Sequence, residues 1–174
     1  MRTIGIDFGT TNTVVALGDA DGVAHTVNFP TTEGATATFR SARSFQIHDG
    51  HDGQPPERVV EAGPWAIEAY VEDPLDTRFI QSFKTFAASA AFTETMIDNK
   101  RYRFEDLLSA FLLRLRHHAG DAFDQAPPRV VVGRPVTFAG GSPDEALALR
   151  RYERAFGRLG FTDIRYAHEP VGAA

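Results

Sequence analysis

The sequence predicts an α/β protein with a mixed five-stranded sheet and flanking helices. Residues 3–29 alternate apolar stretches with short polar turns, which is typical of three antiparallel strands. Residues 104–174 instead alternate helical apolar spacing with short apolar runs, which is typical of helix-and-strand units. The intervening residues 31–102 are less regular, and we interpret them as an inserted α+β subdomain.

The first strands are predicted from their turns as much as from their apolar residues. Residues 3–8 and 13–17 are strand-like runs joined by a tight polar turn at residues 9–12. A second turn, residues 18–22, is rich in glycine and aspartate and leads into a third strand at residues 23–29.

Within the inserted segment, Pro64 predicts a short helix through Val71, because proline is tolerated in the first turn of a helix. Strand-like runs at residues 45–48 and 58–61 flank a polar tip. The histidines and aspartates of this tip, at residues 48–53, are residue types that bind metal ions. Its glycines favour a plain hairpin turn instead.

Two longer helices are predicted in the second half. Leucine and phenylalanine recur at helical spacing over residues 104–115, with acids in the first turn and basic residues near the end at Gly120. A second helix is predicted to start with Ser142 as its cap and Pro143 at its first position.

The strands of the second half are predicted from apolar runs. The valines of residues 129–133 indicate a strand buried on both faces. A last strand is predicted at residues 163–167, and residues 169–174 then begin a further helix.

The first turn has the residues needed to hold a metal-bound phosphate. Gly9 lets the backbone approach an anion closely, and successive N–H groups in such a turn form an anion-binding concavity. Thr10, Thr11 and Asn12 add side-chain donors, and Asp7 can hold Mg²⁺ through water. The alternative is an ordinary hairpin, since such residues are common in turns.

Glu169 is the second acidic candidate. It follows the last predicted strand, and strand ends of a mixed sheet gather on one edge, so Asp7 and Glu169 can face a shared cleft. Two acids there would hold Mg²⁺ and orient a water for attack on a terminal phosphoryl group. The alternative is that Glu169 is only a helix-start carboxylate favoured by the helix dipole.

Composition sets the remaining expectations. The chain of 174 residues has no cysteine, which excludes thiolate chemistry, and it has no apolar run long enough to span a bilayer. No signal peptide is evident, so we expect a cytoplasmic protein without a membrane partner. The net charge of −5 argues against nucleic acid as a partner.

Three segments in order resemble DnaK-type heat-shock chaperones of the actin and hexokinase superfamily. They are IDFGTTN at residues 6–12, VVVGRPVTF at residues 130–138 and HEPVGAA at residues 168–174. The later glycines at residues 140–141 and 160 are most similar to the YegD-like branch. The resemblance implies a ribonuclease-H-like ATPase core of two lobes, with ATP or ADP and Mg²⁺ between them.

The resemblance also implies roles for individual residues. Asp7 corresponds to the acid beside the metal, and Thr10, Thr11 and Asn12 correspond to the phosphate clamp. Glu169 corresponds to the carboxylate near the metal and the attacking water. Family members also use a lysine of the inserted subdomain, which makes Lys84 the candidate to reach the γ-phosphate; the alternative is a solvated surface lysine.

The chain also departs from the family pattern. The second phosphate hairpin and the adenosine-binding segment are missing, so we expect the first lobe only, with core residues 1–30 and 103–174. We therefore expect residues 1–174 alone to bind ATP weakly or not at all and to hydrolyse it negligibly. For the intact protein the resemblance implies ATP hydrolysis. Expected partners are nucleotide, a second lobe, and protein clients or co-chaperones. The alternatives are a lobe of an actin-like filament protein or of a sugar or small-molecule kinase.

Overall fold

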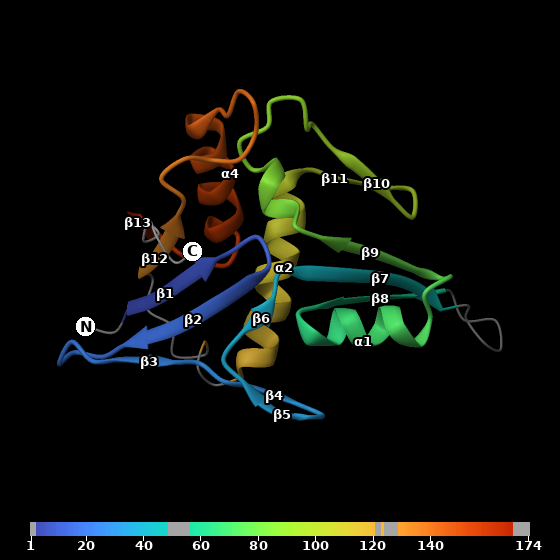
Figure 1. The fold of residues 1–174 in the computed structure, drawn as a ribbon, viewed down its shortest axis with the longest axis horizontal. Coiled ribbons are helices and arrows are strands. Elements are labelled where there is room, and N and C mark those ends of the chain that lie inside the picture. The colour runs from blue at the N-terminus through green and yellow to red at the C-terminus, as the bar shows by residue number, and fades with distance from the viewer. Residues whose placement is uncertain (1–2, 49–55, 121–122, 124–128, 169–174) are drawn as a thin grey trace.

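The computed structural model describes residues 3–48, 56–120, 123 and 129–168 and shows an α/β fold (Figure 1). The main sheet has the strand order β13-β12-β1-β2-β3, with a sixth short strand, β6, beside β2. β1 pairs antiparallel with β2 and parallel with β12, and β12 pairs parallel with β13. The predicted mixed sheet is confirmed, with one strand more than expected. The strands are β1 (Thr3–Phe8), β2 (Asn12–Gly18), β3 (Ala24–Thr26), β6 (Phe39–Arg40), β12 (Arg129–Arg134) and β13 (Asp163–His168).

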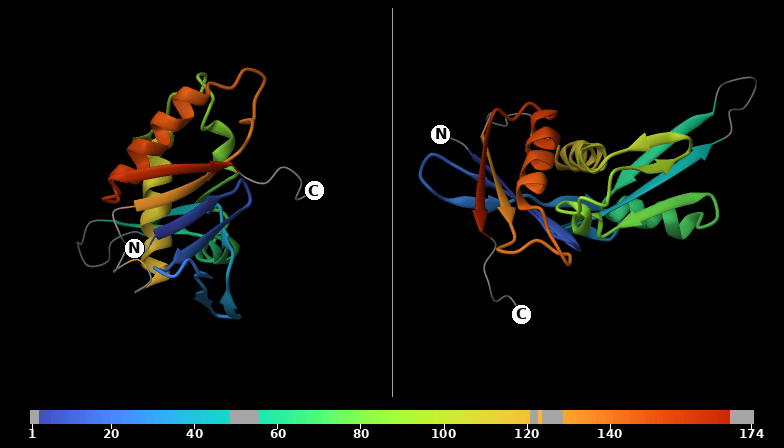
Figure 2. Two further views of the ribbon diagram at one scale, coloured as in Figure 1. Left: turned by 90° about the vertical axis from the view of Figure 1, so that its left-hand side faces the viewer. Right: turned by 90° about the horizontal axis from the view of Figure 1, so that it is seen from above.

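Helices α2 (Phe104–Ala119) and α4 (Glu145–Gly157) pack together beside the main sheet (Figure 2). Their apolar faces form one core with the alternate residues of β1, β2 and β12 that point toward them. Phe8 lies at the centre, with its ring centroid 5.6 Å from that of Phe111 and 6.2 Å from that of Tyr152. Burial of each such side chain contributes about 1.5–3 kcal/mol to the free energy of folding. The core therefore holds the end of β1 in place.

The expected burial of β12 on both faces is wrong. Val130 and Val132 are fully buried, whereas Val131 between them is only half-buried. Side chains alternate across a strand, and Val130 and Val132 belong to the same buried core as the apolar residues of α2 and α4. In the described part of the chain the helical core therefore covers only the face of Val130 and Val132, and β12 lies between β13 and β1 in the sheet.

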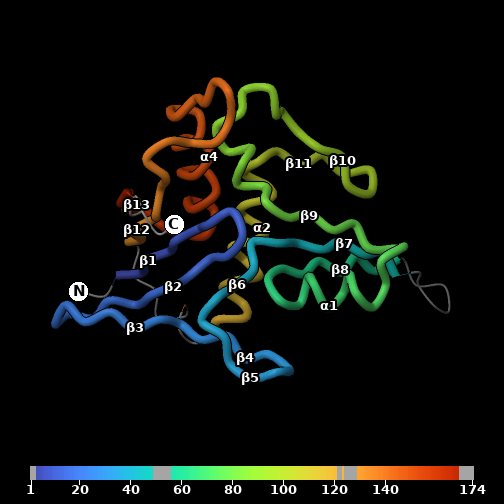
Figure 3. Tube along the Cα trace, viewed as in Figure 1, coloured from blue at the N-terminus to red at the C-terminus, as the bar shows by residue number. Residues whose placement is uncertain are grey.

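A second unit, which we call the arm, consists of strands β7, β8 and β9 with helix α1 packed on them (Figure 1). The chain enters it directly from β6 of the main sheet (Figure 3). The predicted helix from Pro64 is confirmed, as is the pairing of the strands that flank residues 49–55, which lie outside the described residues. The arm comprises β7 (Ala42–His48), β8 (Glu57–Ala62), α1 (Pro64–Glu72) and β9 (Thr77–Gln81). The remaining elements are β4 (Phe29–Thr31), β5 (Gly34–Thr36), η1 (Phe83–Phe86), β10 (Thr95–Ile97) and β11 (Lys100–Tyr102).

A polar cluster fastens the arm to α2. Glu61 of β8 accepts hydrogen bonds from Arg114 and lies 3.0 Å from Nε2 of His118. The His118 ring in turn stacks on Trp65, with ring centroids 3.5 Å apart. Burial acts to raise the pKa of Glu61, but the hydrogen bonds from His118 and Arg114 outweigh it and lower the pKa below its ordinary value. The cluster therefore holds Glu61 ionised.

Two predicted boundaries need correction. The third strand covers only Ala24–Thr26 and not residues 23–29. Ser142 is not the cap of α4: the cap is Asp144, whose Oδ1 accepts the N–H of Leu147 at 2.8 Å. The predicted end of α2 at Gly120 is confirmed, with φ 54° at that glycine.

None of the described helices combines the length and the apolar character needed to cross a bilayer.

Candidate functional site

The turn between β1 and β2 is held tightly by its own backbone. The N–H of Gly9 donates to the carbonyl oxygen of Asn12 at 3.0 Å and lies 3.2 Å from that of Asp7. A Cβ at position 9 would lie only 2.3 Å from the Asn12 oxygen, so this turn requires glycine. Thr10 and Thr11 at its tip are exposed and can meet a ligand.

Ser41, which leads from β6 into β7, supports the turn from behind. Its hydroxyl donates to the carbonyl of Gly9 at 2.7 Å, and its N–H donates to the carbonyl of Thr11 at 2.9 Å. Ser41 is only 2% exposed, and its hydroxyl also lies 2.9 Å from that of Thr13. The next residue back, Arg40, donates to Oδ1 of Asn12 at 3.3 Å. Sequence reasoning missed both residues, because neither belongs to a local motif.

Asp7 lies exposed at the carboxyl end of β1, next to Gly133 of β12. A Cβ at position 133 would lie 2.9 Å from Oδ1 of Asp7 and 3.3 Å from its Cα. The glycine therefore makes room for the carboxylate above the neighbouring strand. A single carboxylate in this position fits a magnesium ion, which commonly takes one or two protein carboxylates together with phosphate oxygens and waters.

Glu169 lies outside the described residues, so its convergence with Asp7 stays a prediction. The strand that precedes it, β13, is described. His168 ends β13 and pairs with Arg134, which follows Gly133 in β12. Because β1, β12 and β13 are parallel, their carboxyl ends lie at the same edge of the sheet.

Lys84 comes to the end of β1 from the segment that follows the arm. It lies in η1, and its Nζ is 5.8 Å from the ring centroid of Phe8, the neighbour of Asp7. The side chain is only 7% exposed, so the alternative of a solvated surface lysine is wrong. The lysine side chain therefore reaches the ring of Phe8 at the end of β1.

Arg151 of α4 holds the main chain that follows Lys84. This arginine is buried, and its guanidinium donates to four carbonyl oxygens of one short loop. They belong to Phe86 (2.8 Å), Ala87 (2.9 Å), Ser89 (3.1 Å) and Phe92 (2.6 Å). Five N–H groups in a rigid fork suit arginine to such a carbonyl cluster. The lysine segment is thereby tied to the helical core.

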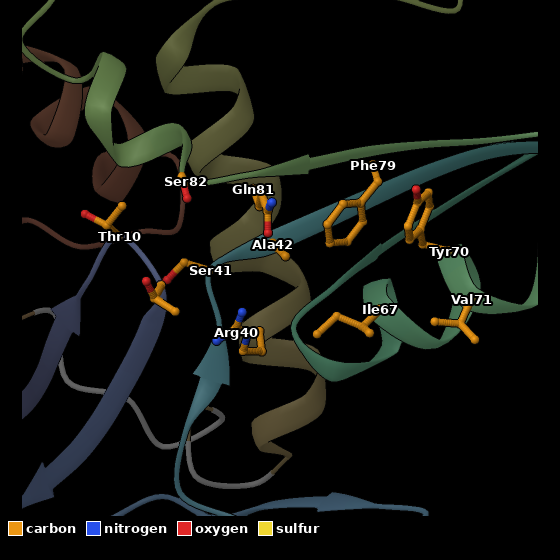
Figure 4. Close-up of a pocket in the computed structure, with 11 residues that line it drawn as sticks. Thr10, Arg40, Ser41, Ala42, Ile67, Tyr70, Val71, Phe79, Gln81 and Ser82 are labelled. Atoms are coloured by element: carbon orange, nitrogen blue, oxygen red, sulfur yellow. The ribbon is translucent and has the colours of Figure 1, made fainter. Parts of the chain in front are cut away.

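A pocket of about 390 Å³ opens beside the turn, between it and the arm (Figure 4). One end is polar and includes the turn itself, and the other end is formed by apolar and aromatic side chains of α1 and β9. Its lining residues are Thr10, Thr11, Arg40, Ser41, Ala42, Ile67, Tyr70, Val71, Phe79, Gln81 and Ser82.

The described residues contain no group of three histidine, aspartate or glutamate side chains placed to hold a metal ion by themselves. No known protein-family model matches the sequence. What the described residues bring together is a glycine-dependent turn with exposed hydroxyls, a carboxylate at a strand end and a lysine. This combination can bind an anion together with a divalent cation.

Proposed function

We propose that the chain is the first lobe of an ATP-binding, chaperone-like protein with a ribonuclease-H-like core. The observation that supports this most is the position of Lys84, which lies 76 residues along the chain from Phe8 and yet packs against its ring at the end of β1. The mixed sheet with helices against it is consistent with such a core. The resemblance of residues 6–12, 130–138 and 168–174 to DnaK-type chaperones implies that the ligand is ATP or ADP.

In this proposal the turn binds the β- and γ-phosphates of ATP. The exposed hydroxyls of Thr10 and Thr11 donate to phosphate oxygens, as does the amide of Asn12. Asp7 and Glu169 hold Mg²⁺ through water, and the ion would neutralise charge on the phosphates. The ammonium of Lys84 stabilises the charge that develops on the γ-phosphoryl group. A second lobe would supply the adenosine contacts, so nucleotide state would set lobe closure.

The proposal is tested on the chain itself with magnesium tripolyphosphate, which has the charge of the ATP tail without the adenosine. We expect weak binding at millimolar concentrations, seen as amide shifts of residues 9–12 in ¹H–¹⁵N spectra. Asp7→Asn should remove the dependence of these shifts on magnesium. Lys84→Met should weaken binding about tenfold or more, as expected for loss of one charge-assisted contact.

Lys100→Met is the matched control, because Lys84 and Lys100 are the only lysines of the sequence and Lys100 lies exposed in β11. It should bind tripolyphosphate as the parent does. Absence of shifts in the turn at saturating ligand, or equal effects of the two lysine substitutions, would exclude the phosphate site. Micromolar affinity of this chain for ATP would exclude the requirement for a second lobe.

A further inference from the structure

The pocket between the turn and α1 shares Thr10 and Thr11 with the phosphate site but extends beyond it toward the arm. Its volume of about 390 Å³ falls in the range of sites for small organic ligands, which is about 300–1,000 Å³. Figure 4 shows Phe79, Tyr70, Val71 and Ile67 on the arm side, and Arg40, Ser41 and Thr10 toward the turn. The pocket is therefore divided into an apolar end and a polar end.

The apolar end is built around a pair of aromatic rings. Tyr70 of α1 and Phe79 of β9 stack with ring centroids 4.9 Å apart and an interplanar angle of 23°. Val71 beside them is 71% exposed and extends the apolar surface of this end. Such a surface favours a flat aromatic or apolar ring over a strongly hydrated ligand.

The polar end selects for negative charge. Among the described residues that line the pocket, Arg40 is the single charged one, and none is an aspartate or glutamate. The hydroxyls of Thr10 and Ser82 and the amide of Gln81 provide further hydrogen-bonding groups. A guanidinium in an acid-free wall is complementary to a carboxylate or a phosphate monoester.

The backbone at the pocket supplies a further observation. Ser82 has φ 55° and ψ 22°, a left-handed conformation that is uncommon for a residue other than glycine. Strained residues of this kind cluster at functional sites. Ser82 also precedes η1 directly, so it joins the pocket wall to the segment of Lys84.

We propose that this pocket binds a small organic anion with an aromatic or apolar ring, its anionic group at Arg40 and its ring against Tyr70 and Phe79. The inference does not require that the turn bind nucleotide. It assigns a second ligand to the same surface, which shares Thr10 and Thr11 with the phosphate site.

The test compares two ligands of the same shape and opposite charge, 2-naphthoate and 2-naphthamidine, titrated into the ¹⁵N-labelled chain without nucleotide or magnesium. We expect 2-naphthoate to shift amides of α1, β9 and residues 40–42, and to bind about tenfold or more tightly than the amidine. Equal binding of the two ligands, or shifts elsewhere only, would overturn the proposal.

Substitutions at Val71 provide a test that does not depend on the turn. This side chain is exposed, so Val71→Asp and Val71→Lys should both fold. We expect the aspartate to weaken 2-naphthoate binding about fivefold or more and the lysine to leave it unchanged or tighter. Equal affinity in the two variants would contradict the charge selection.

Arg40→Gln should weaken 2-naphthoate binding about tenfold. Arg150→Gln, which removes an exposed arginine of α4, controls for the change in net charge and should have no effect. Val71→Asp should still bind magnesium tripolyphosphate as the parent does, so failure of this proposal is distinguishable from failure of the phosphate site.

Discussion

Replacing Gly9 by alanine tests the geometry of the turn with a single methyl group. The added Cβ would lie 2.3 Å from the carbonyl oxygen of Asn12, an atom of the main chain that cannot rotate away as a side chain would. Relieving this contact strains the turn by about 1–3 kcal/mol. It also weakens the 3.0 Å hydrogen bond from the Gly9 N–H to the same oxygen, worth about 1 kcal/mol.

We therefore expect Gly9→Ala to lower the free energy of unfolding by about 2–4 kcal/mol. For a chain of this size, the corresponding fall in Tm is about 5–15 °C. Gly5→Ala is the control on the same strand, because its Cβ would meet nothing closer than 3.9 Å. Both variants are compared by urea and thermal unfolding followed by circular dichroism. If Gly9→Ala unfolds within about 0.5 kcal/mol of Gly5→Ala, the inferred steric requirement is wrong.

Three further substitutions test other parts of the structure. Asp144→Ala should destabilise the protein by about 0.5–2 kcal/mol in urea unfolding, whereas Ser142→Ala should change nothing; the reverse order would restore Ser142 as the cap. Arg151→Met leaves four carbonyl oxygens without their donor and should lower the free energy of unfolding by about 3 kcal/mol. The exposed control Arg150→Met should change it by about zero. Equal urea midpoints of the two variants would show that Arg151 does not hold the loop. Because the folded-state pKa of Glu61 is depressed, its stabilisation is complete above the unfolded value of about 4.3 and is lost as pH falls through the folded pKa. Glu61→Gln should therefore make Tm fall less steeply below about pH 4.5. If Tm falls with pH as in the parent, Glu61 does not contribute to the acid sensitivity of the fold.

Local patterns in the sequence were enough to predict much of this fold. The turn after β1, the helix predicted from residue 104 to Gly120 and the strand predicted at residues 129–133 are confirmed, because each is specified by turn residues or apolar periodicity within a few positions. The candidate carboxylate of Asp7 was found for the same reason, since it directly follows an apolar strand. These features depend on interactions between neighbours in the chain.

The errors and omissions arise where distant segments meet. Ser142 has the local signature of a cap, yet the helix begins later because the N–H of Asp144 donates to the carbonyl of Ala88 at 2.9 Å and fixes the start of α4 against the lysine segment. Ser41 supports a turn 30 residues away, from Ser41 to Thr11, and nothing near it in the sequence indicates this.

The sequence by itself determined the first hairpin, helices α1 and α2 and the later strands β12 and β13, because hydrophobic periodicity and turn residues act over a few positions. Only the tertiary structure decided that Lys84 lies buried beside Phe8, that Arg151 holds the loop after it, and that a pocket opens next to the turn. These depend on how the arm and the helical core pack against the end of β1. Packing of that kind is set by shape and by hydrogen bonds between segments far apart in the chain, which no local pattern records.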